Sequence, residues 1–187
     1  RRLQKKATIG EIVLKYLDEA GFSLSLPLSY TWSLKNQPMR VPKHWGNAGR
    51  INVIGTLSCL KDSQQLEYRL LEGRCKAEQV ESYLETLAQQ ARQQGIQVVI
   101  VLDNAGFHKA KRIKKHFGRW QSMGLTLWFQ PPYSPQFNLI ETVWKKLKAF
   151  LLPRRCYKNR QELLTSLLDA FRLLLAVEIS HCYYGDT

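Results

Sequence analysis

Disulfide bonds and zinc sites have little support in this sequence. It contains four cysteines among 187 residues, and none of them belongs to a C-x-x-C pair. A disulfide framework or a zinc site needs a closer arrangement of such residues, so neither is indicated and a reducing compartment is expected. The chain also has no apolar run long enough to span a bilayer, no secretory signal at its start and no internal repeat.

Acidic residues are scarce as well. The chain has 15 Asp and Glu against 28 Lys and Arg, which gives a net charge of +13. Such an excess attracts polyanions, of which nucleic acid is the commonest. A membrane surface is the weaker alternative, because no helical pattern here is basic on one face and strongly lipophilic on the other. The charge therefore favours a nucleic-acid partner and no membrane.

The length and the start of the chain suggest how it is organised. A chain of 187 residues with 44% hydrophobic residues is expected to form one domain, residues 1–187, with its own core. Residues 1–8 read as a basic lead-in or linker. Because the chain opens on Arg1 rather than Met, we expect an upstream region to precede it.

Periodicity of the apolar residues predicts the secondary structure. Alternating or continuous apolar runs predict strands at 11–17, 51–60, 66–71, 96–102 and 125–129. Helical spacing predicts helices at 76–94, around 110–120, at 138–151 and from about 159 onward. An antiparallel start followed by strand–helix–strand units implies an α/β fold, a mixed five-stranded sheet flanked by helices.

Three carboxylates occupy comparable places in this expected fold. Asp18 and Asp103 each follow an expected strand, and Glu141 lies in the first turn of the helix after a proline-rich turn. Chemistry in open α/β sheets gathers at the carboxyl ends of strands. Plainer roles also exist for all three: Asp18 as a turn residue and Asp103 as a cap between strand and helix. Glu141 also forms a capping-box pattern with Asn138.

A divalent metal would reconcile these acids with one another. Three carboxylates packed together repel, and some of them would have to be protonated. Magnesium takes hard oxygen ligands and keeps water or substrate oxygens in its remaining positions. Two such ions about 3.5–4 Å apart assist phosphoryl transfer by contacting the attacking and leaving oxygens. From the residues alone, the metal site and the separate capping roles are about equally supported.

Two groups of basic residues are candidates for DNA contacts. The first, in an irregular stretch with interleaved aromatic residues, comprises Arg40, Lys43, Trp45 and Arg50. The second, off the apolar stripe of the helix around 110–120, comprises Lys109, Lys111, Arg112 and Lys115. Aromatic and basic residues together can stack on bases and contact phosphates. The alternatives are a surface loop and a solvated helix face.

Three sequence blocks together resemble a known family. YLDEAGF, VVIVLDNAGFH and PPYSPQFNLIETVWKKLK occur in the order found in the catalytic domain of mariner-superfamily transposases, in particular their bacterial insertion-sequence branch. The resemblance implies a ribonuclease H-like fold and a DDE catalytic triad made of Asp18, Asp103 and Glu141. It also implies that these three acids bind Mg²⁺ or Mn²⁺, as two ions.

The resemblance carries further expectations about activity and partners. The family hydrolyses phosphodiester bonds at transposon ends and transfers the 3′ hydroxyl into target DNA, as in cut-and-paste transposition. Asn104, His108 and Asn138 match accompanying positions that either support the acids or face DNA. A homodimer of the full-length protein and a cytoplasmic, nucleoid-associated location in a bacterium are expected. The family's helix-turn-helix DNA-binding region has no counterpart in this sequence.

The third block departs from the usual S-P-D-L-N-P-I-E pattern. Gln136 replaces the acid, Phe137 the leucine and Leu139 the second proline. Two other hypotheses therefore stay open, an inactive DNA-binding relic and another ribonuclease H-like nuclease.

Overall fold

The computed structural model describes residues 2–25, 33–37, 49–59, 64–132 and 134–176. Its strands are β1 (Val13–Phe22), β2 (Ile51–Cys59), β3 (Gln64–Leu71), β4 (Val98–Leu102) and β5 (Leu125–Phe129). Its α-helices are α1 (Arg2–Thr8), α2 (Ala77–Gln94), α3 (Lys111–Lys114), α4 (Phe117–Ser122), α5 (Ile140–Lys146) and α6 (Arg160–Ala176). A short 3₁₀ turn, η1 (Pro135–Phe137), precedes α5, and a π-helical turn, η2 (Leu147–Leu151), follows it.

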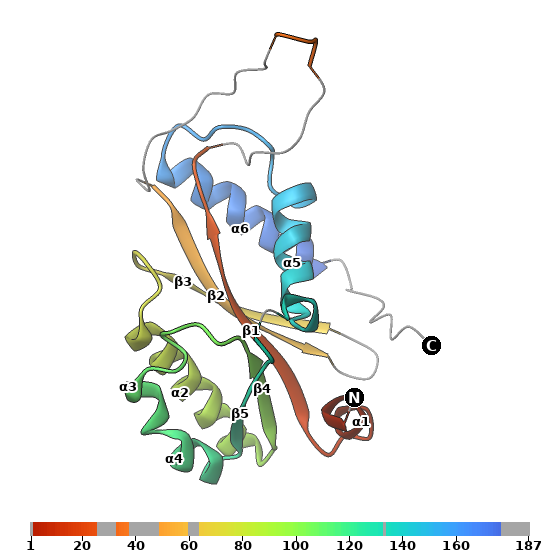
Figure 1. The fold of residues 1–187 in the computed structure, drawn as a ribbon, viewed down its shortest axis with the longest axis vertical. Coiled ribbons are helices and arrows are strands. Elements are labelled where there is room, and N and C mark those ends of the chain that lie inside the picture. The colour runs from red at the N-terminus through yellow and green to blue at the C-terminus, as the bar shows by residue number, and fades with distance from the viewer. Residues whose placement is uncertain (1, 26–32, 38–48, 60–63, 133, 177–187) are drawn as a thin grey trace.

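The five strands form one sheet in the order β3-β2-β1-β4-β5. β1 pairs antiparallel with β2, and β2 pairs antiparallel with β3. β4 runs parallel to both β1 and β5. The expected mixed five-stranded sheet flanked by helices is therefore confirmed, and β1 is its central strand (Figure 1).

Helices cover both faces of this sheet. Figure 1 shows α2, α3 and α4 on one side and α5 and α6 on the other. Alternation along β1 sends Leu14 and Tyr16 into the core beneath α5 and α6, and Leu17 into the core beneath α2. β4 is buried at all five positions, as its continuous β-branched sequence predicts for a strand covered on both faces.

The long helix α2 has the ends and the face that its sequence predicts. It runs for 18 residues and ends at Gly95, whose φ of 64° lies in the left-handed region that glycine adopts readily. Its buried face comprises Val80, Tyr83, Leu84, Leu87, Ala88 and Ala91. Among the described residues, no helix has both the length and the apolar character needed to cross a bilayer.

Three local predictions differ from the structure. The strand expected at 11–17 extends to Phe22, because the DEAGF segment keeps pairing with β2 as far as Ile51. The lead-in expected at 1–8 forms helix α1. The single helix expected around 110–120 is two short helices, separated where the backbone N–H of His116 bonds the carbonyl of Ile113, three residues back.

Candidate active site

The two aspartates lie side by side on neighbouring parallel strands. The last paired residues of β1 and β4 are Tyr16 and Val101. Asp18 and Asp103 each follow two positions later, so they are level with each other and face the same side of the sheet. Asp103 comes directly after β4, as predicted, whereas Asp18 is inside β1, opposite Gly55 of β2. The prediction that Asp18 ends its strand was therefore wrong, and its proximity to Asp103 comes from strand register.

The glutamate arrives from β5 through the proline-rich turn. Glu141 is in the first turn of α5, and its backbone N–H bonds the carbonyl of Asn138. The predicted cap is wrong, because Leu139 is the N-cap residue and no side chain caps this helix. Asn138 is buried and its Nδ2 donates to the backbone carbonyl of Leu17 at 3.1 Å. Asn138 therefore anchors the start of α5 to β1, directly beside Asp18.

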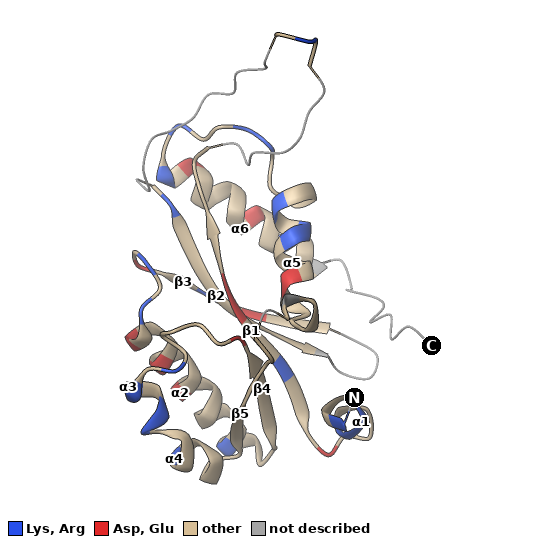
Figure 2. Ribbon diagram, in the orientation of Figure 1, with Lys and Arg blue, Asp and Glu red and all other residues tan. Residues whose placement is uncertain are grey.

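All three acids line one cavity of about 390 Å³. Asn104, Gln130 and Asn138 are also part of its wall. Within the described part of the chain, Asn138 Oδ1 and Gln130 Nε2 are buried without a hydrogen-bond partner. In Figure 2 the acidic segments of β1 and of the first turn of α5 lie near the centre of the molecule. The cavity thus combines three carboxylates with a wall of amide side chains.

The Asp18 carboxylate forms no ion pair in the described part of the chain, although the charge of Lys148 interacts with it at longer range. Its Oδ2 accepts a hydrogen bond from Trp144 Nε1–H at 3.1 Å. Burial raises the pKa of Asp18 to about 7, and the negative charges of Glu19, Asp103 and Glu141 add to the increase. Removal from water and nearby like charge both disfavour the ionised form. The ionised form of Asp18 is therefore destabilised, and a bound cation would stabilise it.

Asp103 is in the opposite situation. Its Oδ1 accepts hydrogen bonds from the backbone N–H of Ala105 at 2.9 Å and from His108 Nδ1 at 2.7 Å. The hydrogen bond from His108 lowers the pKa of Asp103, and the hydrogen bond from Ala105 and the charge of His108 lower it further. Burial acts in the opposite direction and raises this pKa. Asp103 is therefore ionised, with Oδ1 already engaged on the protein side.

His108 is wholly buried between two carboxylates. Nδ1 faces Asp103 at 2.7 Å, and Nε2 faces Glu19 Oε1 at 3.0 Å. Burial lowers the pKa of His108, but the hydrogen bonds to Asp103 and Glu19 outweigh it and raise the pKa to about 9. Sequence reasoning missed Glu19. The signal available was an acid next to Asp18 in a strand, where it must face the other side of the sheet.

Asn104 joins two of the segments that form the cavity. Its Nδ2 donates to the backbone carbonyl of Gln130 at 2.6 Å, and the N–H of Gln130 bonds the carbonyl of Leu102 at 2.9 Å. These bonds connect the end of β4 to the end of β5. Asn104 therefore fixes the proline-rich turn relative to Asp103.

Trp144 and Gly55 are two further residues that the sequence did not single out. A Cβ on Gly55 would lie 3.0 Å from the Trp144 ring and 3.1 Å from the Glu67 carbonyl oxygen. The absence of a side chain at this position lets the indole lie against the sheet. Since Trp144 donates to Asp18, which pairs with Gly55, the glycine helps to place that hydrogen bond.

The donor atoms of the cavity suit a hard divalent cation. Asp18 supplies a buried carboxylate without an ion pair in the described chain, and Asp103 and Glu141 supply two further carboxylates to the same wall. No group of three or more His, Cys, Asp or Glu within the described ranges is compact enough to hold one ion. The acids therefore line a shared space without converging on one point. Magnesium tolerates this arrangement, because it binds through one or two carboxylates plus water and substrate oxygens.

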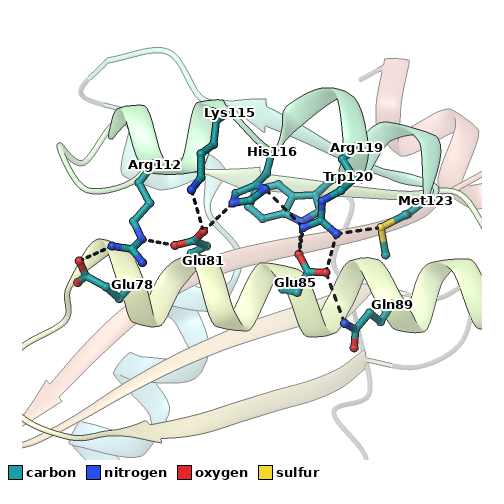
Figure 3. Close-up of polar contacts among 10 residues, drawn as sticks. All are labelled: Glu78, Glu81, Glu85, Gln89, Arg112, Lys115, His116, Arg119, Trp120 and Met123. Atoms are coloured by element: carbon teal, nitrogen blue, oxygen red, sulfur yellow. Dashed lines mark hydrogen bonds and ion pairs between the residues drawn. The ribbon is translucent and has the colours of Figure 1, made fainter.

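Two of the predicted DNA-contacting residues, Arg112 and Lys115, have acidic partners on α2. Figure 3 shows helix α2 presenting Glu78, Glu81 and Glu85 to the basic residues of α3 and α4. Arg112 pairs with Glu78 at 2.9 Å and with Glu81, and Lys115 Nζ lies 3.9 Å from Glu81. His116, Arg119 and Trp120 complete the network. It attaches α3 and α4 to α2, and matching spacing of acids and bases on the two segments was the sequence signal for it.

The other predicted basic contacts are distributed differently. Lys109 Nζ lies 5.8 Å from the centroid of the Phe129 ring, and Lys111 is exposed. Arg50 Nε donates to Asn52 Oδ1 at 2.9 Å, and Arg50 lines a second cavity of about 500 Å³ together with Arg74. The predicted contacts Arg40, Lys43 and Trp45 lie outside the described residues.

Two of the three substituted positions in the third block are exposed, and the other has a backbone angle that proline can adopt. Leu139 has a φ of −60°, within the range that a proline would impose at the same position. Gln136 and Phe137 are exposed in η1. The backbone at position 139 therefore has a φ that either leucine or proline can adopt.

Comparison with known proteins shows what this arrangement resembles. The Mos1 transposase paired-end complex with left transposon end has a TM-score of 0.65 and 15% identity, covering 96% of this chain and 52% of that chain. The Mos1 mariner paired end complex with Mn has a TM-score of 0.65 and 16% identity, covering 95% and 52%. This chain thus spans about half the length of these proteins. The similarity confirms the ribonuclease H-like fold predicted from the sequence.

A sequence comparison gives a bacterial relative and a family. The uncharacterized protein y4pE/y4sA of Sinorhizobium fredii is 28% identical over 101 residues, 54% of this chain and 70% of that protein. Residues 13–164 match the family model described as DDE superfamily endonuclease. This segment contains every strand of the sheet and all three acids of the cavity. The chain therefore belongs to the DDE superfamily endonucleases.

Proposed function

We propose that this chain is the catalytic domain of a DNA transposase. It hydrolyses phosphodiester bonds at transposon ends and transfers the freed 3′ hydroxyl into target DNA. The observation that carries the proposal is the cavity lined by Asp18, Asp103 and Glu141, in a chain that belongs to an endonuclease family. Structural similarity to Mos1 complexes that contain transposon ends supports DNA as the substrate.

The proposed cofactor is Mg²⁺ or Mn²⁺, bound as two ions by Asp18, Asp103 and Glu141. When bound, these ions supply the activation of the attacking hydroxyl and the stabilisation of the leaving oxygen. Support comes from the buried carboxylate of Asp18, which forms no ion pair in the described part of the chain, and from the manganese in a Mos1 complex of the same fold. In the chain itself, His108 and Ala105 hold Asp103 Oδ1, and Trp144 holds Asp18 Oδ2.

The basic surface near the end of β1 is proposed to contact the DNA backbone. Desolvation lowers the pKa of Lys148, the positive charge of Arg50 lowers it further, and the negative charge of Asp18 opposes both effects. Neither side chain forms an ion pair with a carboxylate in the described part of the chain. Two neighbouring cations that form no ion pair suit a phosphate. Lys109 and Lys111 are also proposed contacts, while Arg112 and Lys115 would have to exchange their pairing with α2 for a phosphate.

Other features of the proposal concern the whole protein. We propose that residues 1–187 act as a single catalytic domain and that a region outside this sequence recognises transposon ends. The paired-end assemblies of Mos1 support a homodimer. A DNA substrate in a bacterium implies a cytoplasmic, nucleoid-associated location.

A nicking assay tests the proposal. The 187-residue chain is incubated with supercoiled plasmid and Mn²⁺, and we expect nicked product that disappears with EDTA or with the Asp103→Asn variant. Nicking that survives Asp103→Asn would contradict the proposed triad. No metal-dependent nicking by the wild-type chain would instead favour the DNA-binding relic. Joining of a 3′ end to a second duplex separates a transposase from another ribonuclease H-like nuclease.

A further inference from the structure

Glu19 is an acid that the triad does not use. It directly follows Asp18 in β1, and consecutive strand residues face opposite sides of the sheet. Asp18 faces α5, where Trp144 bonds it, while Glu19 faces the side covered by α2 and α3. Its side chain is only 15% exposed, and its sole ion pair among the described residues is with His108. A buried carboxylate is costly unless it is paired in this way.

His108 extends this contact around the end of the sheet to the cavity. β4 stops at Leu102, so the segment that follows is free to contact both faces of β1. Nε2 of His108 donates to Glu19 Oε1 at 3.0 Å, and Nδ1 donates to Asp103 Oδ1 at 2.7 Å. Both acceptors are carboxylates, so both ring nitrogens must carry protons. Glu19, His108 and Asp103 therefore form one continuous hydrogen-bonded chain.

The consequence lies at the two oxygens of Asp103. Oδ1 accepts from both His108 and the N–H of Ala105. Within the described residues Oδ2 has no hydrogen-bond partner, and the side chain is half exposed in the wall of the cavity. Fixing one oxygen fixes the rotation of the carboxylate and leaves the other oxygen available to a ligand in the cavity. Carboxylates that bind a metal are commonly held in orientation by hydrogen bonds from residues outside the set of ligands.

We propose that Glu19 is a positioning residue that acts through His108 to hold the Asp103 carboxylate in the orientation that binds a divalent cation. This inference rests on the proposed function, because it needs the cavity to bind metal. It adds a fourth acid, on the opposite face of the sheet, to the residues on which metal binding depends. Glu19 itself contacts neither the cation nor the DNA.

Manganese binding provides a test that does not depend on cleavage. Free Mn²⁺ is measured by electron paramagnetic resonance while the 187-residue chain is titrated, and unfolding is followed by circular dichroism. We expect Glu19→Ala and His108→Ala each to weaken Mn²⁺ binding about 10-fold or more, the usual cost of losing such an outer partner. Glu19→Gln keeps an acceptor for Nε2–H and is expected to bind within about threefold of the wild type.

Two further variants separate orientation from stability and from charge. Glu67→Ala removes a partly buried strand carboxylate that pairs with Lys15 away from the cavity, so it should lower the unfolding temperature and leave Mn²⁺ affinity unchanged. The double variant Glu19→Ala/His108→Ala should bind Mn²⁺ no worse than His108→Ala alone, because Glu19 acts through the histidine.

Each other outcome contradicts a defined part of the inference. Wild-type affinity in Glu19→Ala would overturn the positioning role. If Glu19→Gln and Glu19→Ala lost the same Mn²⁺ affinity, the negative charge of Glu19, and not its hold on His108, would be responsible. The same conclusion would follow if the double variant bound Mn²⁺ more weakly than His108→Ala. A wild-type chain that binds no Mn²⁺ would contradict the proposed function itself.

Discussion

The carboxylates of α2 and those of the cavity differ in what surrounds them. Glu81 and Glu85 face arginine and histidine side chains from α3 and α4 (Figure 3). The hydrogen bonds from Arg119 hold the pKa of Glu85 near 2, and those from Arg112 lower the pKa of Glu81. In the cavity, burial and the charges of neighbouring acids instead raise the pKa of Asp18 to about 7.

The difference shows which acids are structural and which require a ligand. In a chain of net charge +13, cations are abundant, yet none of the described ones pairs with Asp18. The acids of α2 are neutralised within the protein and attach one helix to two others. Among the cavity acids, Asp103 pairs with His108, whereas Asp18 forms no ion pair in the described part of the chain and is left for a cation. The direction of the pKa shift separates Asp18, whose pKa is raised, from Glu81 and Glu85, whose pKa values are lowered by their cationic partners. The pKa of Asp103 is lowered as well, because His108 is its partner.

The largest expected difference between the two groups is in activity. Asp18→Asn removes a proposed metal ligand, so we expect DNA nicking in Mn²⁺ to fall by more than the roughly 100-fold that losing an outer partner costs. Glu85→Gln should change nicking by less than about threefold, because Glu85 only secures α4 to α2. Initial rates of plasmid nicking for both variants check this. Similar losses of nicking rate in both variants would contradict the difference between the cavity acids and the acids of α2.

The second comparison concerns stability without metal. The folded pKa of Asp18, about 7, lies above its ordinary value of 3.8, so the folded state binds the extra proton and loses stability as the pH rises through this window. Asp18→Asn should therefore stabilise the metal-free chain at pH 8 by about 4 kcal/mol. The gain should shrink as the pH is lowered toward 4.

Denaturant unfolding in EDTA at several pH values measures this gain. Asparagine keeps an acceptor for Trp144 Nε1–H, so the variant changes charge and little else. A destabilised Asp18→Asn chain at pH 8 would contradict the account.

The third comparison uses the metal itself. A cation that binds only the folded chain stabilises it by about 2.7 kcal/mol at 100 times its dissociation constant. We expect Mn²⁺ to raise the unfolding temperature of the wild-type chain and of Glu81→Gln, and to leave that of Asp18→Asn nearly unchanged. Differential scanning calorimetry with and without Mn²⁺ checks this, and an equal rise in all three chains would place the ion elsewhere.

The smallest expected effect is on the α2 network. The folded pKa of Glu85 lies below its ordinary value of 4.5, so its contribution is present above that pH and is lost as the pH falls toward 2. Its partner Arg119 is about half exposed, and solvent screens the pair. Glu85→Gln should therefore destabilise the chain at pH 7 by less than about 1 kcal/mol, measured by urea unfolding. Stabilisation by this variant would contradict the account.

Most of the fold could be predicted from the sequence, because the patterns that indicate its strands and helices depend on neighbouring residues. The alternation in β3 and β5, the continuous apolar run of β4 and the glycine after α2 all follow from neighbouring residues. The strand β1 was harder, because DEAGF contains turn-forming residues. Only pairing with β2, far along the chain, keeps it extended. Tertiary contacts here override local preference.

The three acids of the site could be predicted from their residue types and from their places near strand ends. Asp18, Asp103 and Glu141 were located by the strands and the turn expected to precede them, and the family resemblance supported all three. Contacts between distant residues were not accessible in the same way. The bond from Asn138 to Leu17 spans 121 positions, and that from His108 to Glu19 spans 89. Neither leaves a periodic signal in the sequence.

The most direct test of the account is a crystal of this chain soaked in Mn²⁺, with the ions located by their anomalous scattering. We expect manganese in the cavity, ligated by Asp18, Asp103 and Glu141. The claim that the cavity acids bind the divalent cation would be contradicted if manganese bound only along Glu78, Glu81 and Glu85. An ordered cavity without manganese would contradict it as well.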